Sequence, residues 1–509
     1  MIIPKYPAFN IFTGIASKTT ALGPLCVATS ISKLPGWDVE VIDENNYHYP
    51  APIDERGMPD HSALQQLRPA AAVGFYGGLS CTVPRLLEVA AYYIQAGVLT
   101  IVGGQHLDAL PQDALAAGMD IVVHGEGEIA AQEILQARDA GLALDGIAGI
   151  SFLRDGRLVR TAPREPLEDF EPLPLPDFGL LRFATLRRFP INRIRGCGMD
   201  CEFCSVKGRA RCATPERLLA QISYAAEAHG ARDFFVVDDQ FAQDRSETLR
   251  FCRLLRDYEL RLGWRFNLAV QMRLDCARDT QLLQAMRDCG INFIAVGFES
   301  PIDEELRAMG KHLRGSEMVE QARILHRWGF FVHGMFIFGY PMLPGMDFSM
   351  SAAQRIRRFR TFIRQSQVDT VQVLLAVPIP GTALRTRLEC EGRVLPASEI
   401  GWEYYDGNFP VFIPDPPLTP EQMQRAILKL MGAFYGFQRM LGTALHTLRF
   451  PLAMLPLVNL RTRFRHWYRQ WYNDVVGSMG YFIVRNWLRA FRQGQFQEKL
   501  RRGKAQLDM

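Results

Sequence analysis

The chain has 509 residues, of which 48% are hydrophobic and 22% charged, and its formal net charge at pH 7 is +4. This length exceeds what one hydrophobic core ordinarily supports, so we predict two or three domains. So small a net charge excludes a polyelectrolyte that binds nucleic acid along its whole length. No signal peptide opens the sequence and no stretch reaches about 18 apolar residues, so we expect a cytoplasmic protein without a membrane-spanning helix. In that compartment the ten cysteines are expected to be free thiols or metal ligands and not disulfides.

Residues 1–150 are predicted to form an α/β domain. Four short β-branched runs, at 39–45, 71–78, 99–104 and 120–128, alternate with helical patterns at 83–97 and 110–118. This alternation is typical of a doubly wound, Rossmann-like parallel sheet with helices on both faces. Ligands in such sheets bind beyond the carboxyl ends of the strands, where most of these runs end in glycine. Each glycine could equally be only a turn or a helix cap.

The central part of the chain is predicted to be an incomplete barrel. Residues 151–187 are rich in proline and charge, which favours a short hairpin followed by an extended linker. Strand–helix alternation resumes over residues 188–417 with six βα-type units. A complete (β/α) barrel has eight such units, so we predict a partial, open (β/α)6 TIM-like barrel.

A cysteine loop follows the first strand of this barrel. Cys197, Cys201 and Cys204 have the spacing C-x3-C-x2-C, with Phe203 before the third cysteine. Three thiolates this close together can bind a soft metal or an iron–sulfur cluster. Structural zinc usually takes four ligands from two separated pairs, and no second C-x2-C occurs, although Cys212 could serve as a distant fourth ligand. A [4Fe–4S] cluster held by three cysteines would keep one iron open for a small molecule.

The loop CGMDCEFC, and the sequence from 188 to about 385 around it, resemble the radical S-adenosylmethionine (SAM) enzymes. The resemblance implies a partial six-unit barrel and a [4Fe–4S] cluster on the three cysteines. The open iron would be chelated by the amino and carboxylate groups of SAM, whose reductive cleavage yields methionine and a 5′-deoxyadenosyl radical that abstracts hydrogen. Strand-end residues that match SAM contacts in the family, and especially in its cobalamin-associated branch, are Asp238, Asp239, Gln271, Arg273, Glu299, Ser300 and Lys311. The family's common Gly-Gly-Glu is absent from the second strand, and polar strand-end groups also occur as caps or ion-pair partners.

The N-terminal domain resembles the cobalamin-binding-type domain that precedes many radical SAM barrels. The matching positions, implied to contact cobalamin, are Ser80, Gly103, Gly104, His106, Gly125, Glu126 and Gly127, followed by Glu128. Domains that ligate cobalt use Asp-x-His-x-x-Gly early in the fold, whereas the first 40 residues here contain no histidine, and Asp60 and His61 are adjacent. Two interpretations stay open: cobalamin binds without a protein ligand to cobalt, or the domain has lost cobalamin and only supports the barrel.

Residues 418–509 are predicted to be helical and unusually basic. Apolar residues recur at spacings of three and four, and from His446 onward there are twelve Lys or Arg against three acidic residues, interspersed with Trp467, Trp471 and Trp487. This region is either a helical cap whose aromatic side chains pack on the barrel, or a contact for an anionic surface such as a membrane, tetrapyrrole carboxylates or RNA.

These features together predict a radical SAM iron–sulfur enzyme. Methyl transfer from methylcobalamin to an unactivated carbon is the leading reaction that the resemblance implies. A radical cyclisation or rearrangement without methyl transfer is the alternative reaction, and a non-catalytic iron–sulfur or zinc-binding protein is the alternative of another class. The expected partners are a small-molecule substrate, an external one-electron reductant such as flavodoxin or ferredoxin, and a membrane surface touched by the C-terminal region. No nucleic acid partner is indicated.

Overall fold

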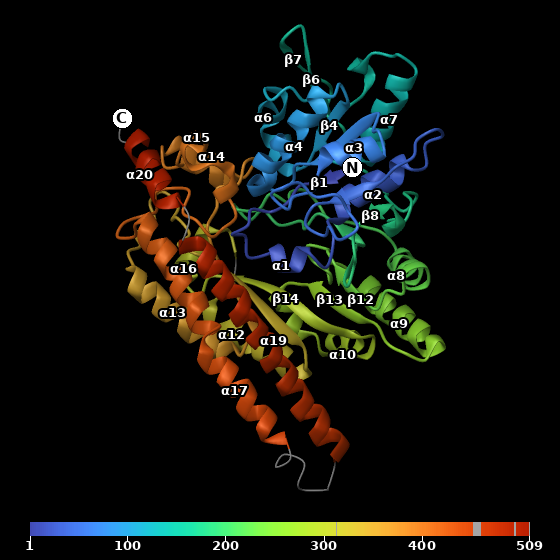
Figure 1. Ribbon diagram of the computed structural model, residues 1–509. Coiled ribbons are helices and arrows are strands. Elements are labelled where there is room, and N and C mark those ends of the chain that lie inside the picture. The colour runs from blue at the N-terminus through green and yellow to red at the C-terminus, as the bar shows by residue number, and fades with distance from the viewer. Residues whose placement is uncertain (312, 451–459, 493–494, 508–509) are drawn as a thin grey trace.

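The computed structural model of the protein describes residues 1–311, 313–450, 460–492 and 495–507. Its N-terminal domain lies over one end of an open barrel, and the C-terminal helices pack along the side of that barrel (Figure 1). The ligand-binding ends of both sheets therefore meet between the two domains.

The N-terminal sheet has eight strands in the order β7-β6-β5-β4-β3-β1-β2-β8. Their bounds are β1 (Ile2–Ile3), β2 (Val41–Asp43), β3 (Ala72–Tyr76), β4 (Leu99–Gly103), β5 (Ile121–Val123), β6 (Ile150–Arg154), β7 (Arg157–Arg160) and β8 (Leu181–Arg182). Strands β1–β5 and β8 are parallel, whereas β6 and β7 run antiparallel at one edge, so the sheet is mixed where the sequence predicted a parallel one. The turn Asp155–Gly156, where both residues have positive φ (50° and 73°), joins β6 directly to β7 as an antiparallel pair.

Two strands of this sheet were not expected from the sequence. The two-residue β1 pairs with both β2 and β3 near the middle of the sheet, and β8 extends it beyond β2. Residues 151–187, predicted as a hairpin and linker, thus contribute most of β6, all of β7 and all of β8 to the N-terminal sheet.

Helices cover both faces of the N-terminal sheet, as predicted. They are α1 (Thr13–Ala16), α2 (Leu22–Ile31), α3 (His61–Leu67), α4 (Val83–Gln95), α5 (Gln105–Ala109), α6 (Pro111–Leu115) and α7 (Gly127–Asp139), with 3-10 turns η1 (Ser80–Thr82) and η2 (Leu144–Gly146). The apolar side of α4 packs on one face of the sheet through Leu86, Val89 and Tyr93. Helix α7 packs on the other through Ile134 and Leu135.

The central domain is a six-stranded open barrel. Its parallel strands follow chain order: β9 (Phe189–Ile191), β12 (Asp233–Val236), β13 (Asn267–Gln271), β14 (Ile291–Glu299), β15 (Phe331–Phe338) and β16 (Thr370–Leu375). The end strands β9 and β16 do not pair, which confirms the predicted partial barrel. The surrounding helices are α8 (Pro215–His229), α9 (Arg245–Leu262), α10 (Thr280–Asp288), α11 (Asp303–Ala308), α12 (Gly315–Trp328), α13 (Ala352–Ser366), α14 (Ala383–Cys390) and α15 (Ala397–Ile400), with η3 (Phe178–Leu180), η4 (Leu274–Arg278) and η5 (Trp402–Tyr404).

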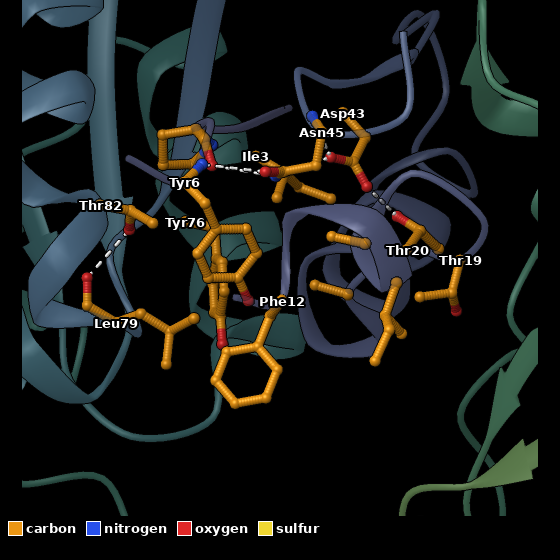
Figure 2. A pocket seen from close by; sticks show the side chains of 14 residues that line it. Ile3, Tyr6, Phe12, Thr19, Thr20, Asp43, Asn45, Tyr76, Leu79 and Thr82 are labelled. Carbon is orange, nitrogen blue, oxygen red and sulfur yellow. Dashed lines mark hydrogen bonds between the residues drawn. The ribbon is translucent and has the colours of Figure 1, made fainter. Parts of the chain in front are cut away.

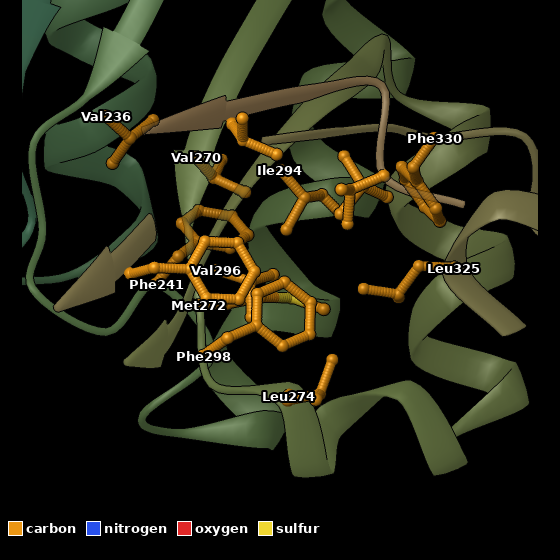
Figure 3. Close-up of a cluster of buried hydrophobic side chains, with 14 of the residues drawn as sticks. Val236, Phe241, Val270, Met272, Leu274, Ile294, Val296, Phe298, Leu325 and Phe330 are labelled. Carbon is orange, nitrogen blue, oxygen red and sulfur yellow. The ribbon is translucent and has the colours of Figure 1, made fainter. Parts of the chain in front are cut away.

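The main hydrophobic core lies between the barrel strands and these outer helices. Val236, Val270 and Ile294 are in register on adjacent strands and are fully buried; with Phe298 and Phe330 they belong to one apolar cluster (Figure 3). Because side chains alternate across a strand, the intervening residues face the inside of the barrel. Those on β13 and β14 include the small Ala269, Ala295 and Gly297.

The C-terminal region is helical, with α16 (Pro420–Phe434), α17 (Phe437–Leu448), α19 (Leu460–Arg492) and α20 (Phe496–Leu507). The capping box of Thr419 and Gln422 starts α16, and the Tyr435 hydroxyl fixes its end to β16 by donating to the carbonyl of Val371 (2.8 Å). The sequence predicted a continuous helical pattern beyond α16, but the helix is interrupted near Gly436. Helices α17 and α19 then form a hairpin that projects past the barrel (Figure 1). Within the described residues, no helix has both the length and the apolar content needed to cross a bilayer.

Candidate active site between the two domains

The cysteine loop is held by a small hairpin just beyond the first barrel strand. Strands β10 (Ile194–Arg195) and β11 (Arg211–Cys212) pair antiparallel, and the loop 196–210 connects them. Gly196 permits this closure: its φ is +84°, and a Cβ atom there would lie 2.7 Å from the carbonyl oxygen of Arg209. Cys212 lies in the stem of the hairpin, paired with Ile194 and exposed, whereas Cys197, Cys201 and Cys204 all lie in the loop.

The three loop cysteines are candidate ligands of an iron–sulfur cluster. All are free thiols; Cys201 is buried and the other two are half-buried. Burial raises the pKa of the Cys197 and Cys204 thiols. Among the described residues, no three Cys, His, Asp or Glu side chains converge as they would around one metal ion. In a [4Fe–4S] cluster each thiolate binds a different iron.

Glu202, inside the cysteine motif, ties the loop to the far side of the barrel. Its carboxylate accepts two hydrogen bonds from Arg387 of α14 (2.6 and 3.0 Å) and one from the Tyr340 hydroxyl (2.5 Å). Its backbone N–H donates to the carbonyl oxygen of Met309 (3.3 Å). Burial and the carboxylate of Glu202 together raise the pKa of Tyr340, which keeps its hydroxyl a donor. Sequence reasoning missed this contact because Arg387 is 185 residues away from Glu202.

Arg387→Met should loosen the cysteine loop without removing a cluster ligand. The substitution leaves the half-buried carboxylate of Glu202 short of its two charge-assisted hydrogen bonds, a loss of about 2 kcal/mol. We expect the reconstituted protein to lose iron to a chelator roughly 30-fold faster, because each 1.4 kcal/mol corresponds to a factor of ten.

Arg393→Met is the matched control. Arg393 is similarly placed and pairs with Glu391 and Asp415, but not with the cysteine loop. Equal rates of iron loss from the two variants would show that Glu202 does not position the loop.

Glu299 lies at the carboxyl end of β14 in an unusual backbone conformation. Its φ is +60°, and the pairing of β14 with β15 shifts register between Gly297 and Glu299. Positive φ is strained for a residue other than glycine, and such strain is typical of functional sites. The Lys311 ammonium group donates to its Oε1 (2.6 Å). A Cβ atom at position 297 would lie 2.4 Å from that same oxygen, so Gly297 makes room for the carboxylate.

The other strand-end candidates divide into two groups. Asp239, Gln271 and Arg273 are brought together near the cysteine loop: the Gln271 side chain donates to the Asp239 carbonyl (3.4 Å), and Arg273 reaches the sulfur of Met199 (3.7 Å). Asp238 and Ser300 are instead fully buried and have partners within the protein.

Asp238 supports the hairpin that carries the cysteine loop. Its Oδ1 accepts the backbone N–H groups of Arg193 and Ile194 (2.7 and 2.8 Å). Burial, outweighing these hydrogen bonds, raises its pKa to about 7. Ser300 donates to the buried Glu305, which pairs with Arg355.

A cavity of about 360 Å³ opens at the carboxyl ends of β4 and β5 in the N-terminal domain. The predicted Gly103, Gly104, Gly125, Glu126 and Gly127 all line it. Helices α2 and α7 form its sides, and Asn192, Arg195 and Val237 of the barrel close it from across the domain boundary. Gly104 has φ +129°, and a Cβ atom there would lie 2.4 Å from the nitrogen of Gly78. A largely apolar cleft walled by glycine backbone fits the tail of a large cofactor such as cobalamin.

A second cavity of about 220 Å³ adjoins the first at the carboxyl ends of β1, β2 and β3 (Figure 2). Tyr76 lines both cavities, and Tyr6 and Phe12 add aromatic surface to the second. Asp43 also lines it, and burial raises the pKa of this carboxyl to about 6 against hydrogen bonds from Thr20 and Asn45.

Ser80 and His106 line neither cavity and bind each other. The Nδ1 atom of His106 lies 2.9 Å from the Ser80 hydroxyl, and its Nε2 atom lies 3.0 Å from Asp113. The remaining histidines of residues 1–150 are likewise hydrogen-bonded, to protein groups that include Asn46, Glu44, Tyr93, Asp108 and Ser151; these histidines are His48, His61 and His124. No histidine lines either cavity.

Four charged groups join the cofactor-sized cavity to the cysteine hairpin. Glu126 pairs with Arg195 (2.9 Å) and Arg211 (3.0 Å), and Glu128 pairs with Arg195 (2.6 Å). Burial alone would raise the pKa of Glu126, but hydrogen bonds from both arginines outweigh it and lower that pKa. These pairs fix the orientation of the cavity relative to the cysteine loop, and sequence reasoning had identified only the glutamates.

Comparison with known proteins identifies one family domain and a shared fold. Residues 191–353 match the sequence model of the Radical SAM superfamily. An uncharacterized methyltransferase of Pyrococcus horikoshii is 24% identical over 353 residues, covering 67% of this chain and 73% of the relative. The anaerobic magnesium-protoporphyrin IX monomethyl ester cyclase of Cereibacter sphaeroides is 26% identical over 266 residues, covering 49% of this chain and 43% of that protein.

Among solved structures, the cobalamin-dependent SAM radical enzyme OxsB, with aqua-cobalamin and SAM bound, has the same fold. The alignment has a TM-score of 0.65 at 13% identity and covers 99% of this chain and 83% of OxsB. The matching residues 191–353 contain the cysteine loop and most of the barrel. Together with the open barrel and the three free thiols at its mouth, this match shows that the chain contains a radical SAM domain.

Proposed function

We propose that this protein is a cobalamin-dependent radical SAM methyltransferase that acts on an unactivated carbon of a small molecule. The observation that carries the proposal is the meeting of two sites across one domain boundary. The cysteine loop and the glycine-walled cavity share Arg195, which lines the cavity and immediately precedes the loop. When bound, the cluster and SAM supply a hydrogen-abstracting radical, and cobalamin supplies a methyl group. The named P. horikoshii relative is likewise a methyltransferase.

The residues of this chain would divide the work between the two sites. Cys197, Cys201 and Cys204 would each hold one iron. Glu299, oriented by Lys311 at 2.6 Å, would accept a hydrogen bond from SAM at the barrel mouth. The walls of the cavity would hold cobalamin by backbone approach at Gly104 and by apolar contact with α2 and α7.

We further propose that no histidine of the chain ligates cobalt. The support is that neither cavity has a histidine among its lining residues and that every histidine of residues 1–150 already has a protein partner. Electron paramagnetic resonance of the cob(II)alamin form should show no nitrogen splitting from an axial imidazole. Splitting that disappears in His106→Ala would contradict this.

The reaction itself is tested by product analysis. Anaerobically reconstituted protein, given SAM, a chemical reductant and an extract of the producing cell, should form 5′-deoxyadenosine, S-adenosylhomocysteine and a methylated product. Formation of 5′-deoxyadenosine without S-adenosylhomocysteine would favour cyclisation or rearrangement, which the similarity to a cyclase keeps as the second candidate. If neither 5′-deoxyadenosine nor S-adenosylhomocysteine forms, the result would favour the alternative of a non-catalytic iron–sulfur or zinc-binding protein.

The proposed setting is the cytoplasm, with an external one-electron donor such as flavodoxin or ferredoxin. Radical SAM enzymes in general require such a donor and a small-molecule substrate.

Glu299→Ala should weaken SAM binding while leaving the cluster in place. Removing one charge-assisted hydrogen bond costs about 1–3 kcal/mol, or roughly five- to 150-fold in the dissociation constant. Anaerobic titration calorimetry of the reconstituted protein would measure this, with iron content determined in parallel.

Glu304→Ala is the control for this variant. Glu304 lies nearby on α11 but pairs only with the exposed Arg307 among the described residues. Unchanged SAM affinity in Glu299→Ala would leave Glu299 with only its structural ion pair to Lys311.

A further inference from the structure

The α17–α19 hairpin exposes apolar side chains on one side of each helix. On α17 these are Phe437, Leu441, Leu445 and Leu448, and on α19 they include Phe464, Tyr468, Tyr472, Met479 and Phe482. Spacings of three, four and seven place each set on a single helix face. Leu448 is 74% exposed and Phe482 57% exposed. Exposed apolar side chains gathered on neighbouring helices are characteristic of interaction surfaces.

Other side chains of α19 have partners within the protein. The Trp467 ring packs at a tilt against Phe450 with ring centroids 4.4 Å apart and lies beside the exposed Phe464, and the Trp471 indole donates to the Thr447 hydroxyl (2.8 Å). Farther along α19, Val484 and Trp487 are buried in the main core. The two helices of the hairpin thus contact each other and the core through these residues, and the exposed apolar side chains lie outside those contacts.

The charge of this segment is strongly asymmetric. Residues 437–492 contain nine arginines, no lysine and a single acidic residue, Asp474. The segment therefore has a net charge of +8 while the whole chain has +4, which leaves the rest of the chain at −4. Among the arginines whose side chains the structure describes, Arg449, Arg485 and Arg489 are all exposed. A basic apolar surface with interspersed tyrosines favours the headgroup region of a membrane.

We propose that the exposed face of the α17–α19 hairpin docks on the surface of an anionic lipid bilayer. The apolar side chains would enter the acyl boundary, while the arginines pair with lipid phosphates. The arginines prevent α19 from spanning, in agreement with the absence of any membrane-crossing helix among the described ones. The hairpin projects away from the N-terminal domain (Figure 1), so docking leaves the boundary between the two domains accessible. This inference concerns location and does not depend on the reaction.

Vesicle flotation of the full-length protein tests the proposal. Vesicles of phosphatidylcholine with about 30 mol% phosphatidylglycerol should carry the protein upward, and pure phosphatidylcholine should bind it at least about tenfold less, because each basic residue gains from the anionic surface. Raising NaCl from about 0.1 to about 0.5 M should weaken binding, since salt screens this attraction.

The variant Leu448→Glu/Phe482→Glu should lose at least about tenfold in bound fraction, because it places two carboxylates in the proposed contact. Leu260→Glu is the matched control, since Leu260 is 70% exposed on α9, remote from the hairpin. Circular dichroism melting and iron content should be unchanged in both, because all three positions are exposed. The proposal is overturned if the wild type fails to float with anionic vesicles, or if the double variant floats as the wild type does. A third outcome would also overturn the proposal: the wild type does not bind vesicles but forms a stable dimer, and the double variant is monomeric. That result would show that the exposed face binds a second copy of this chain.

Discussion

Replacing any one of Cys197, Cys201 and Cys204 by alanine should remove the iron–sulfur cluster, and SAM cleavage with it. Each thiolate holds one iron, and the fourth iron already lacks a protein ligand, so the cluster cannot spare another. Anaerobically reconstituted wild-type protein should contain about four irons per chain, with the absorbance and electron paramagnetic resonance of a [4Fe–4S] centre. The variants should contain almost none and form no 5′-deoxyadenosine above background.

The control for this experiment is Cys212→Ala. Cys212 is exposed in the stem of the hairpin, opposite Ile194 and outside the loop that holds the other three. It should retain full iron content and activity. Full iron content in a triple loop variant, or stoichiometric zinc that resists chelation in the wild type, would contradict the cluster assignment and return the loop to a structural role.

The second large effect concerns the cavity between α2 and α7. Val27 lies on α2 and lines the cavity opposite Gly127 of α7. A Cβ atom built at position 127 would lie 3.2 Å from the Cγ2 atom of Val27. Val27→Phe should fill part of the roughly 360 Å³ space and abolish retention of cobalamin. The readout is the cobalamin absorbance that remains with the protein after incubation with hydroxocobalamin and gel filtration, which requires neither substrate nor SAM.

A substitution at the same position provides the control. Val27→Ala keeps the helix and leaves the cavity open, so it should retain cobalamin as the wild type does, at a stability cost of about 1–2 kcal/mol for the lost methyl groups. Equal retention by Val27→Phe would exclude this cavity as the cobalamin site. Failure of the wild type to bind any cobalamin would withdraw the methyl-transfer proposal, whereas the radical SAM domain match of residues 191–353 does not depend on cobalamin and would stand.

Local patterns in the sequence determined most element types and pointed to the proposed cluster ligands. The strands and helices of residues 188–417 follow from apolar periodicity, because each element buries one face against a neighbour. The cysteine spacing identified the loop, because three thiols within eight residues are brought together by the local chain alone. The glycines at 103, 104, 125 and 127 pointed to the cavity that they now line, since close backbone approach excludes larger side chains.

Contacts distant in sequence were decided only by the tertiary structure. Two residues, Ile2 and Ile3, form a central strand solely because β2 and β3 lie on either side of them. The anchoring of Glu202 by Arg387, and of Glu126 by Arg195 and Arg211, joins segments that no local pattern relates.

The same holds for the histidine and serine that matched cobalamin-binding positions. His106 and Ser80 satisfy each other's hydrogen bonds in the fold and do not line either cavity. A sequence specifies which groups can bind a ligand, but only packing decides which of them have already found a partner within the protein, because each buried polar group must be satisfied by whatever the fold brings near it.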